Sequence, residues 1–141
     1  MSMKLKSLER LVDRARVSLL GSVDENGMPN IKAMLKPRQH IGLKEFYFST
    51  NLSAMRTQQY LQNPKACLYF YRKGLISYAG LMLRGKVEVL TDQESKNLLW
   101  EPGDVKYYTQ GVTDPDYCVL KFTAESGRYY QDLRSEELEI R

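Results

Sequence analysis

Short runs of apolar and aromatic residues, each ended by turn residues, limit the fold of this chain more than any other feature. Such runs are typical of β-strands, and they occur at 17–23, 30–36, 44–50, 65–73, 76–90, 116–126 and 127–134. The Asn26-Gly27 pair between the first two runs is a hairpin signal, and the first three strands are predicted to form a meander. The run at 76–90 is long enough to bend at Gly80 or Gly85.

Helical spacing of apolar residues occurs in three places. An amphipathic helix is predicted over the first dozen or so positions. A second, short helix follows the strand at 44–50, with Asn51 or Ser53 as its N-cap, and a third begins with a capping box of Thr91 and Glu94. Because the helices do not alternate with the strands as in a parallel sheet, the sequence predicts a mainly β fold, a small antiparallel barrel of at least six strands with a few short helices.

The bulk properties of the chain fit one domain spanning residues 1–141. Its residues are 43% hydrophobic and 27% charged, which are ordinary values for a globular protein that needs no disulfide or structural metal. No apolar run approaches the roughly 20 residues of a membrane helix, and the first residues do not read as a secretory leader. We therefore expect a cytoplasmic protein without membrane contact.

The charges and cysteines exclude further classes of protein. The net charge is +4, but lysines and arginines are interleaved with acidic residues, so nucleic-acid binding is not expected. Cys67 and Cys118 are isolated within apolar runs and are expected to be free thiols. His40 is the single histidine, and the sequence has no P-loop and no GxGxxG motif, so no metal site, histidine relay or nucleotide fold is expected. No catalytic residue can be assigned, and redox chemistry would have to come from a bound cofactor.

The stretch FSTNLSAMR at 48–56 is the best candidate for holding a cofactor. It concentrates hydroxyl groups and an amide where a strand gives way to a helix, whose N-terminus favours a phosphate. Arg56 lies in the first turn of that helix, where a cation opposes the helix dipole unless an anion neutralises it. The alternative is a plain helix cap with a solvated arginine.

Lys32 lies in the middle of the mostly apolar strand 30–36 and offers a second cation. A single lysine at such a position usually faces solvent or joins an ion pair. If the strands 30–36 and 44–50 are neighbours, however, Lys32 and Arg56 approach the same anion. Ala33 and Met34 would then present backbone groups and an apolar wall to whatever carries the phosphate.

The order of these elements resembles the flavin-binding split barrels of the pyridoxamine 5'-phosphate oxidase superfamily, and most closely their short, general-stress-protein branch. The segments that carry the resemblance are PNIKAM, FYFSTNLSAMR, RGKVEVL and DPDYCVLKF. The resemblance implies a six-stranded antiparallel split β-barrel of Greek-key topology. It also implies a homodimer with FMN at the subunit interface.

The resemblance assigns cofactor contacts along two strands, one helix and one aromatic residue. The basic phosphate ligand of the second strand falls on Lys32, the residues beside the flavin ring on Ala33 and Met34, and the hydroxyl pair of the third strand on Ser49 and Thr50. The full implied set is Lys32, Ala33, Met34, Ser49, Thr50, Asn51, Met55, Arg56 and Trp100. Trp100 is either an interface or core aromatic or a cover for the flavin or substrate space from the partner subunit.

Three departures from the family pattern narrow the expected function. Met55 replaces the first of two adjacent basic residues, Gly80 stands near the position of a ring-contacting glutamine, and the C-terminal substrate-binding extension has no counterpart. The sequence therefore predicts an FMN-dependent oxidoreductase acting on an unknown small molecule, with NADH or NADPH as a candidate partner, rather than an enzyme of vitamin B6 synthesis. Alternatives are a non-catalytic flavin-binding stress protein, a deazaflavin-dependent relative and, with His40 as ligand, a haem protein.

Overall fold

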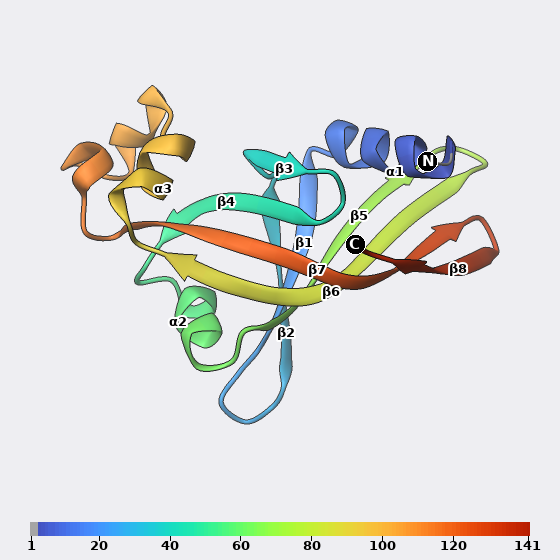
Figure 1. The fold of residues 1–141 in the computed structure, drawn as a ribbon, viewed down its shortest axis with the longest axis horizontal. Helices are drawn as coiled ribbons and strands as arrows, with labels where there is room; N and C mark the ends of the chain where they lie inside the picture. Colours follow the sequence, from blue (N-terminus) through green and yellow to red (C-terminus); the bar gives the residue numbers. More distant parts are fainter. Residues whose placement is uncertain (1–2) are drawn as a thin grey trace.

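The computed structural model describes residues 3–141, which form three α-helices, two short 3-10 helices and eight strands (Figure 1). The helices are α1 (Met3–Arg14), α2 (Met55–Gln62), α3 (Gln93–Leu99), η1 (Pro102–Lys106) and η2 (Gly111–Thr113). The strands are β1 (Val17–Val23), β2 (Pro29–Leu35), β3 (Gln39–Ile41), β4 (Glu45–Asn51), β5 (Lys65–Lys73), β6 (Tyr78–Leu90), β7 (Tyr117–Gln131) and β8 (Arg134–Glu139).

All strand pairings are antiparallel, so the predicted mainly β class is confirmed. The strands follow the order β2-β1-β5-β6-β7-β4-β3, with β8 paired to β7. Hydrogen bonds do not close this sheet, because β2 and β3 lie at the two ends of the order. In Figure 1 the helix α1 covers one end of the sheet, and α3 with the two 3-10 helices gathers at the other.

The structure has eight strands, whereas the resemblance implied six and the sequence showed seven strand-like runs. The predicted strands 116–126 and 127–134 merge into β7, and Gly127 lies within it, packed against Leu83. Of the two further strands, β3 lies between the predicted strands 30–36 and 44–50, and β8 follows the last apolar run. The polar strand β8 is held by ion pairs as well as by its backbone, since Glu137 accepts hydrogen bonds from Arg84 on β6 and from Arg128 on the adjacent strand β7.

The predicted meander of the first three strands is wrong. The hairpin at Asn26-Gly27 forms as expected and joins β1 to β2. The next long strand, β4, pairs instead with β3 and β7, and β2 lies at the opposite end of the sheet order. Pairings between strands distant in sequence are set by packing of the whole sheet, which a local pattern does not specify.

The predicted bend of the strand at 76–90 falls at Gly85. The pairing of β6 with β7 shifts register between Arg84 and Gly85. A side chain at Gly85 would collide with the carbonyl of Thr123 on β7, so glycine is required where the two backbones approach.

The core lies between α1 and the inner face of the sheet. Leu8 and Val12 place the apolar side of α1 in it, which confirms the predicted amphipathic helix. Alternating residues of the central strands point inward, and β4 shows strict alternation of buried and half-buried positions. The fully buried aromatic residues of the core are Phe46, Phe70 and Phe122.

Both predicted helix caps are wrong. Ala54 is the N-cap of α2 and makes no side-chain cap bond, while the Ser53 hydroxyl donates to Asp116, 3.0 Å away. At α3 the cap is Asp92, whose carboxylate accepts from the backbone N–H of Ser95 at 3.0 Å. In both cases an acidic residue that local spacing did not single out takes the polar contact.

Two further sequence predictions concern sulfur chemistry and membranes. Cys67 and Cys118 are free, as expected, and burial raises the pKa of the Cys118 thiol to about 11. None of the helices formed by residues 3–141 is both long and apolar enough to cross a bilayer.

Candidate cofactor site

A small pocket of about 250 Å³ gathers side chains from β2, β4 and α2 and from the segment after β2. Four of its residues are basic and none is acidic, which favours an anionic ligand. It brings together five of the nine residues implied by the resemblance, although β2 and β4 are not paired. The lining consists of Lys32, Ala33, Met34, Leu35, Lys36, Arg38, Phe48, Ser49 and Arg56.

Arg56 is the residue whose chemistry best defines this pocket. Its terminal nitrogen donates a hydrogen bond of 2.8 Å to the hydroxyl of Thr50, which is itself buried at the end of β4. Its Nε is buried, and no described residue accepts a hydrogen bond from it. A buried donor without a partner is costly, and an anionic oxygen in the pocket would remove that cost. The residues present therefore fit a phosphate group.

Of the other three basic residues of the pocket, two form hydrogen bonds with described residues and one does not. Lys36 donates to the backbone carbonyl of Asp13. Arg38 makes two hydrogen bonds to the carboxylate of Asp104, at 2.5 and 2.7 Å. Within residues 3–141 the ammonium of Lys32 has neither an ion-pair nor a hydrogen-bond partner. Lys32 and Arg56 are thus the two cations of the pocket that neither a carboxylate nor a backbone carbonyl of the described residues engages.

Lys32 and Met34 point to the pocket side of β2, and Ala33 is exposed between them. Met34 is buried and supplies an apolar wall. Since β2 pairs only with β1, its outer edge leaves backbone groups available beside the pocket.

Ser49 connects the pocket to an aromatic cluster behind it. Its hydroxyl lies 3.4 Å from the phenol of Tyr117, which donates to the backbone carbonyl of Lys96 at 3.0 Å. Trp100 and Tyr108 pack on Tyr117, with ring centroids 5.1 and 5.0 Å away. Burial raises the pKa of Tyr117, so its phenol stays protonated at neutral pH. Trp100 supports this cluster and is not part of the pocket lining.

Asn51 and Met55, also in the implied set, do not line the pocket. The amide of Asn51 donates to Ser53 at 2.9 Å, which places it in the turn before α2. Met55 is the first residue of α2 and is 74% exposed. A long basic side chain at Met55 would start beside the pocket, whereas the thioether adds no charge.

Arg38 and Asp104 are site residues that sequence reasoning missed. The guanidinium of Arg38 holds the pKa of the Asp104 carboxyl below its usual range, and Asp104 also accepts from the backbone N–H of Glu101 at 3.0 Å. Arg38 further donates to the carbonyl of Leu99 at 2.9 Å. Together these contacts tie the pocket rim to α3 and η1. A basic residue just after strand 30–36 was the only feature in the sequence that pointed to Arg38. No local pattern, however, connects Arg38 with Asp104, which lies 66 residues further along the chain.

Gly80 lies against the hydroxyl groups of two tyrosines. The hydroxyls of Tyr69 and Tyr78 are hydrogen-bonded to each other, and a side chain at Gly80 would collide with the Tyr69 hydroxyl. Two phenols therefore fill the space near which the family places a glutamine.

His40 makes structural contacts at both ring nitrogens. Nδ1 lies 2.8 Å from the carbonyl of Gly42, and Nε2 lies 2.6 Å from the carboxylate of Asp13 on α1. The ring also stacks on Phe46 at 5.7 Å between centroids. Both ring nitrogens of His40 are thus occupied by contacts near α1, and His40 does not line the pocket. It is therefore a poor haem ligand.

The sequence profile of the family described as pyridoxamine 5'-phosphate oxidase matches residues 5–131, which include every residue of the pocket. The chain belongs to this pyridoxamine 5'-phosphate oxidase family. Members of the family typically bind a flavin. The predicted resemblance is therefore confirmed.

Three similar proteins align with this chain over different lengths. The pyridoxine/pyridoxamine 5'-phosphate oxidase of Agrobacterium fabrum is 36% identical over 76 residues, so the aligned part covers 54% of this chain but only 35% of that protein. A Clostridium acetobutylicum protein related to general stress protein 26 is 42% identical, with a TM-score of 0.84 over 99% of this chain and 97% of that one. General stress protein 26 of Bacillus anthracis, at 17% identity, shares the fold with a TM-score of 0.77 over 99% and 100% of the two chains.

Proposed function

We propose that this chain binds FMN, with the phosphate in the pocket between β2, β4 and α2, and acts as an FMN-dependent oxidoreductase on a small molecule. The observation that carries the proposal is the buried Nε of Arg56, which has no acceptor among the described residues although its neighbours are polar and cationic. A phosphate oxygen would accept from it in a charge-assisted hydrogen bond. A neutral ligand would leave both Arg56 and Lys32 uncompensated.

The residues of the pocket have distinct parts in this proposal. Arg56 and Lys32 bind the phosphate, and Thr50 orients the guanidinium through its hydroxyl. Ser49 adds a neutral hydrogen bond, and Met34 excludes water from one wall of the pocket. When bound, FMN would supply hydride transfer between a reduced nicotinamide and a small acceptor. Synthesis of pyridoxal phosphate is not part of the proposal.

A titration of the purified protein with FMN tests the cofactor assignment. We expect saturable quenching of flavin fluorescence at or below tens of micromolar FMN, with weaker binding of riboflavin, which lacks the phosphate. No binding in that range would contradict the proposal. Parallel titrations with a deazaflavin and with haemin identify a different cofactor.

Oxidation of NADH or NADPH by the FMN-loaded protein separates an enzyme from a flavin carrier. Steady turnover with an added electron acceptor is expected for the enzyme. Bound flavin that neither nicotinamide reduces would favour the non-catalytic alternative.

We further propose that two copies of the chain pair through the outer face of β2, β1 and β5. Strand register places Ile31, Leu35, Val17 and Tyr71 on this face, and their exposed fractions are 69%, 81%, 43% and 45%. Exposed apolar residues in one contiguous patch mark an interface. Because β2 forms both this face and a wall of the pocket, a second copy here would border the flavin, as expected for a homodimer with an interfacial cofactor.

Introducing charge on this face is expected to produce monomers. The variant Ile31→Glu buries an unpaired carboxylate if two copies meet, which opposes association. Light scattering coupled to size exclusion should show a dimer for the wild type and a monomer for Ile31→Glu. The control is Ile41→Glu, since Ile41 is also exposed but lies on β3 at the other end of the sheet order. A monomeric wild type, or a dimer that survives Ile31→Glu, would exclude this interface.

A further inference from the structure

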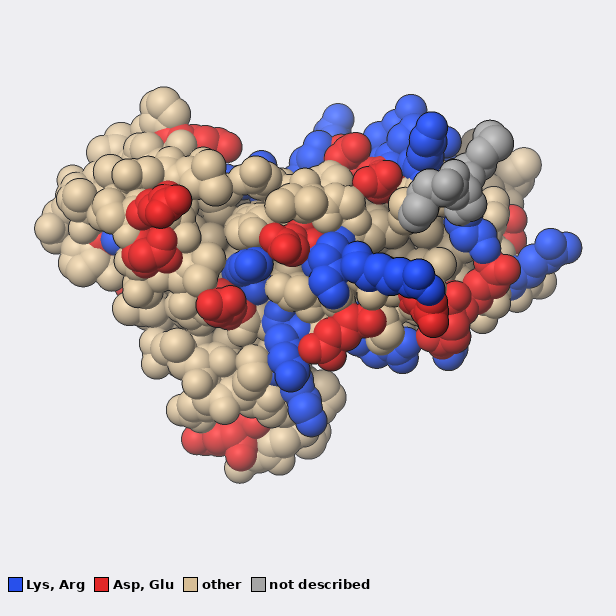
Figure 2. Space-filling view, in the orientation of Figure 1, with Lys and Arg blue, Asp and Glu red and all other residues tan. Residues whose placement is uncertain are grey.

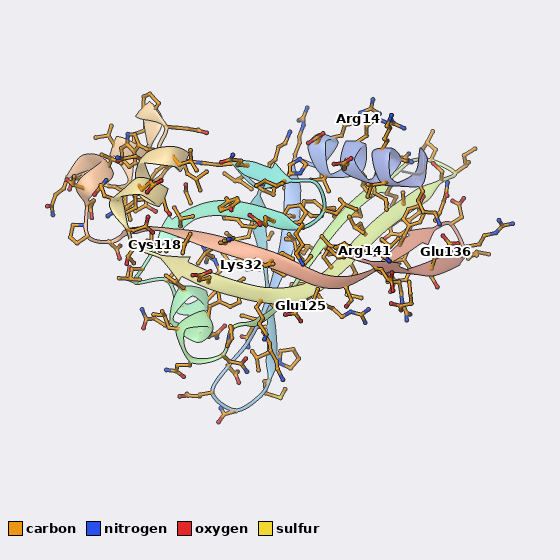
Figure 3. The ribbon with its side chains drawn as sticks, in the orientation of Figure 1. Arg14, Lys32, Cys118, Glu125, Glu136 and Arg141 are labelled. Atoms are coloured by element: carbon orange, nitrogen blue, oxygen red, sulfur yellow. The ribbon has the colours of Figure 1, made fainter. Side chains whose placement is uncertain are left out.

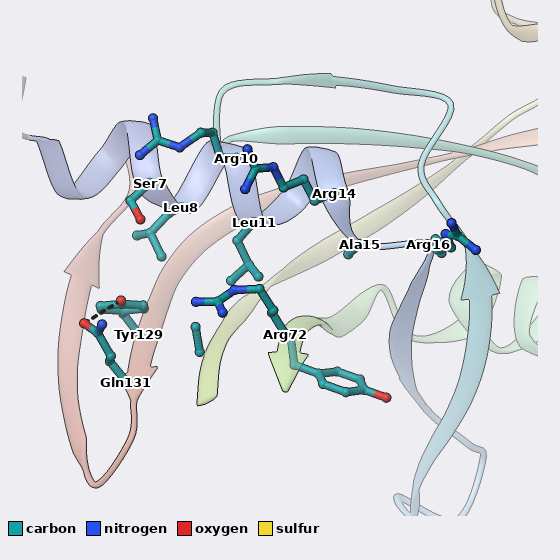
Figure 4. Close-up of a pocket in the computed structure, with 12 residues that line it drawn as sticks. Ser7, Leu8, Arg10, Leu11, Arg14, Ala15, Arg16, Arg72, Tyr129 and Gln131 are labelled. Carbon is teal, nitrogen blue, oxygen red and sulfur yellow. Dashed lines mark hydrogen bonds between the residues drawn. The ribbon is translucent and has the colours of Figure 1, made fainter. Parts of the chain in front are cut away.

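A second, larger cavity of about 470 Å³ lies beneath α1, against the end of β5, the start of β6 and the end of β7 (Figure 4). This volume is in the range of small-molecule sites. Four of its residues are arginines, and no aspartate or glutamate lines it. The lining consists of Ser7, Leu8, Arg10, Leu11, Arg14, Ala15, Arg16, Tyr71, Arg72, Ala79, Tyr129 and Gln131.

The four arginines of this cavity carry uncompensated charge. Among residues 3–141 none of them forms an ion pair. By contrast, the arginines that face a carboxylate elsewhere in the molecule are Arg38, Arg84, Arg128 and Arg141. In Figure 2 basic side chains gather over α1. Several like charges around one cavity repel one another, and an anion within it would relieve that repulsion.

The arginines differ in how they face the cavity. Arg72 extends from β5 to a position beneath α1, and Arg10 and Arg14 project from the helix above it (Figure 4). Arg16 lies apart from the other three, just before β1 (Figure 4). Guanidinium groups present paired N–H donors that match a phosphate, so Arg72 and Arg14 are the principal candidates for binding one.

The rest of the lining suits a ligand with an organic body. Leu8, Leu11 and Ala79 form an apolar wall in which each side chain is buried. The hydroxyl of Tyr129 donates to Gln131 at 2.9 Å and leaves its oxygen able to accept from a ligand. We propose that this cavity is a second binding site, for a small phosphorylated molecule whose phosphate contacts Arg72 and Arg14 and whose body packs against the apolar wall.

This site is separate from the candidate flavin pocket. The two linings share no residue, and Arg14 and Lys32 lie well apart (Figure 3). Tyr71 lies on the rim of the cavity and also on the outer face of β5, so the cavity opens beside the proposed dimer interface. The inference does not depend on flavin binding, because its own arginines define the ligand chemistry.

Calorimetric titration of the full chain with phenyl phosphate, inorganic phosphate and phenol tests the inference. Phenyl phosphate carries both the anion and an apolar body, so we expect it to bind more tightly than inorganic phosphate, with no detectable binding of phenol. Both Arg72→Gln and Arg14→Gln should weaken phenyl phosphate at least about tenfold, because each removes a charge-assisted contact. Inorganic phosphate binding as tightly as phenyl phosphate would contradict the assigned organic body.

Two control variants make the result specific. Lys65→Gln also removes one positive charge from β5, but at the other end of the strand, and should leave the affinity unchanged. Arg56→Gln removes the phosphate contact of the flavin pocket, so any phenyl phosphate bound there is lost in this variant, and the binding that remains reports the cavity beneath α1. The inference fails if phenyl phosphate does not bind at millimolar concentration, or if Arg56→Gln abolishes binding while Arg72→Gln does not. The arginines are exposed, and thermal unfolding of each variant checks that the fold is intact.

Discussion

Replacing Arg56 by glutamine is expected to weaken FMN binding about 10- to 100-fold, since hydrogen bonds between charged groups contribute about 1.5–3 kcal/mol. The guanidinium is partly buried, is oriented by Thr50 and has an Nε donor without an acceptor among the described residues. Riboflavin has the same ring system as FMN but no phosphate, so its affinity should change little. Fluorescence titration of the wild type and Arg56→Gln with both flavins measures the difference.

One control variant and one variant that adds a positive charge complete this experiment. Arg134→Gln removes an exposed arginine from the far strand β8 and should leave both affinities unchanged. Met55→Arg places a second cation in the first turn of α2 and should tighten FMN but not riboflavin. Equal losses for the two flavins in Arg56→Gln would show that Arg56 supports the fold of the pocket rather than the phosphate.

The sequence predicted the pocket better than it predicted the sheet that forms it. Lys32 and Arg56 do line one pocket, but not because their strands are neighbours. The strand β2 pairs only with β1, and β4 pairs with β7, so the two strands meet through the curvature of the whole sheet. Curvature depends on many pairings between distant segments, and no local pattern around either residue specifies it.

The polar contacts that support the pocket were the hardest to predict. Arg38 donates hydrogen bonds to Asp104, which lies 66 positions further along the chain, and Ser53 donates to Asp116, 63 positions away. Local rules for caps and turns evaluate neighbours within about four residues, so they favoured Asn51 or Ser53 as the cap of α2 and could not include Asp116. By contrast, the amphipathic helix α1 and the Asn26-Gly27 hairpin depend on local spacing alone, and both form as predicted.

Replacing Arg38 by alanine is expected to lower the free energy of unfolding by about 3 kcal/mol, because it leaves the buried carboxylate of Asp104 without its cation. The side chain of Asp104 is 7% exposed, and that of Arg38 is 25% exposed. Urea denaturation measures the loss. The control is Lys106→Ala, which removes an exposed cation from η1, the 3-10 helix that contains Asp104, and should have little effect. In the double variant Arg38→Ala, Asp104→Ala the two losses should be less than additive.

The dependence of this loss on pH tests its electrostatic origin. Arg38 lowers the pKa of Asp104 below the ordinary value of 3.8, so the folded state favours the ionised carboxylate more than the unfolded chain does. The resulting stabilisation is fully present above pH 3.8 and is lost as the pH falls through the lowered pKa. The difference in unfolding free energy between wild type and Arg38→Ala should thus be largest near neutral pH and should shrink in acid. A difference that stays constant into acid would instead assign the loss to the packing of the arginine side chain.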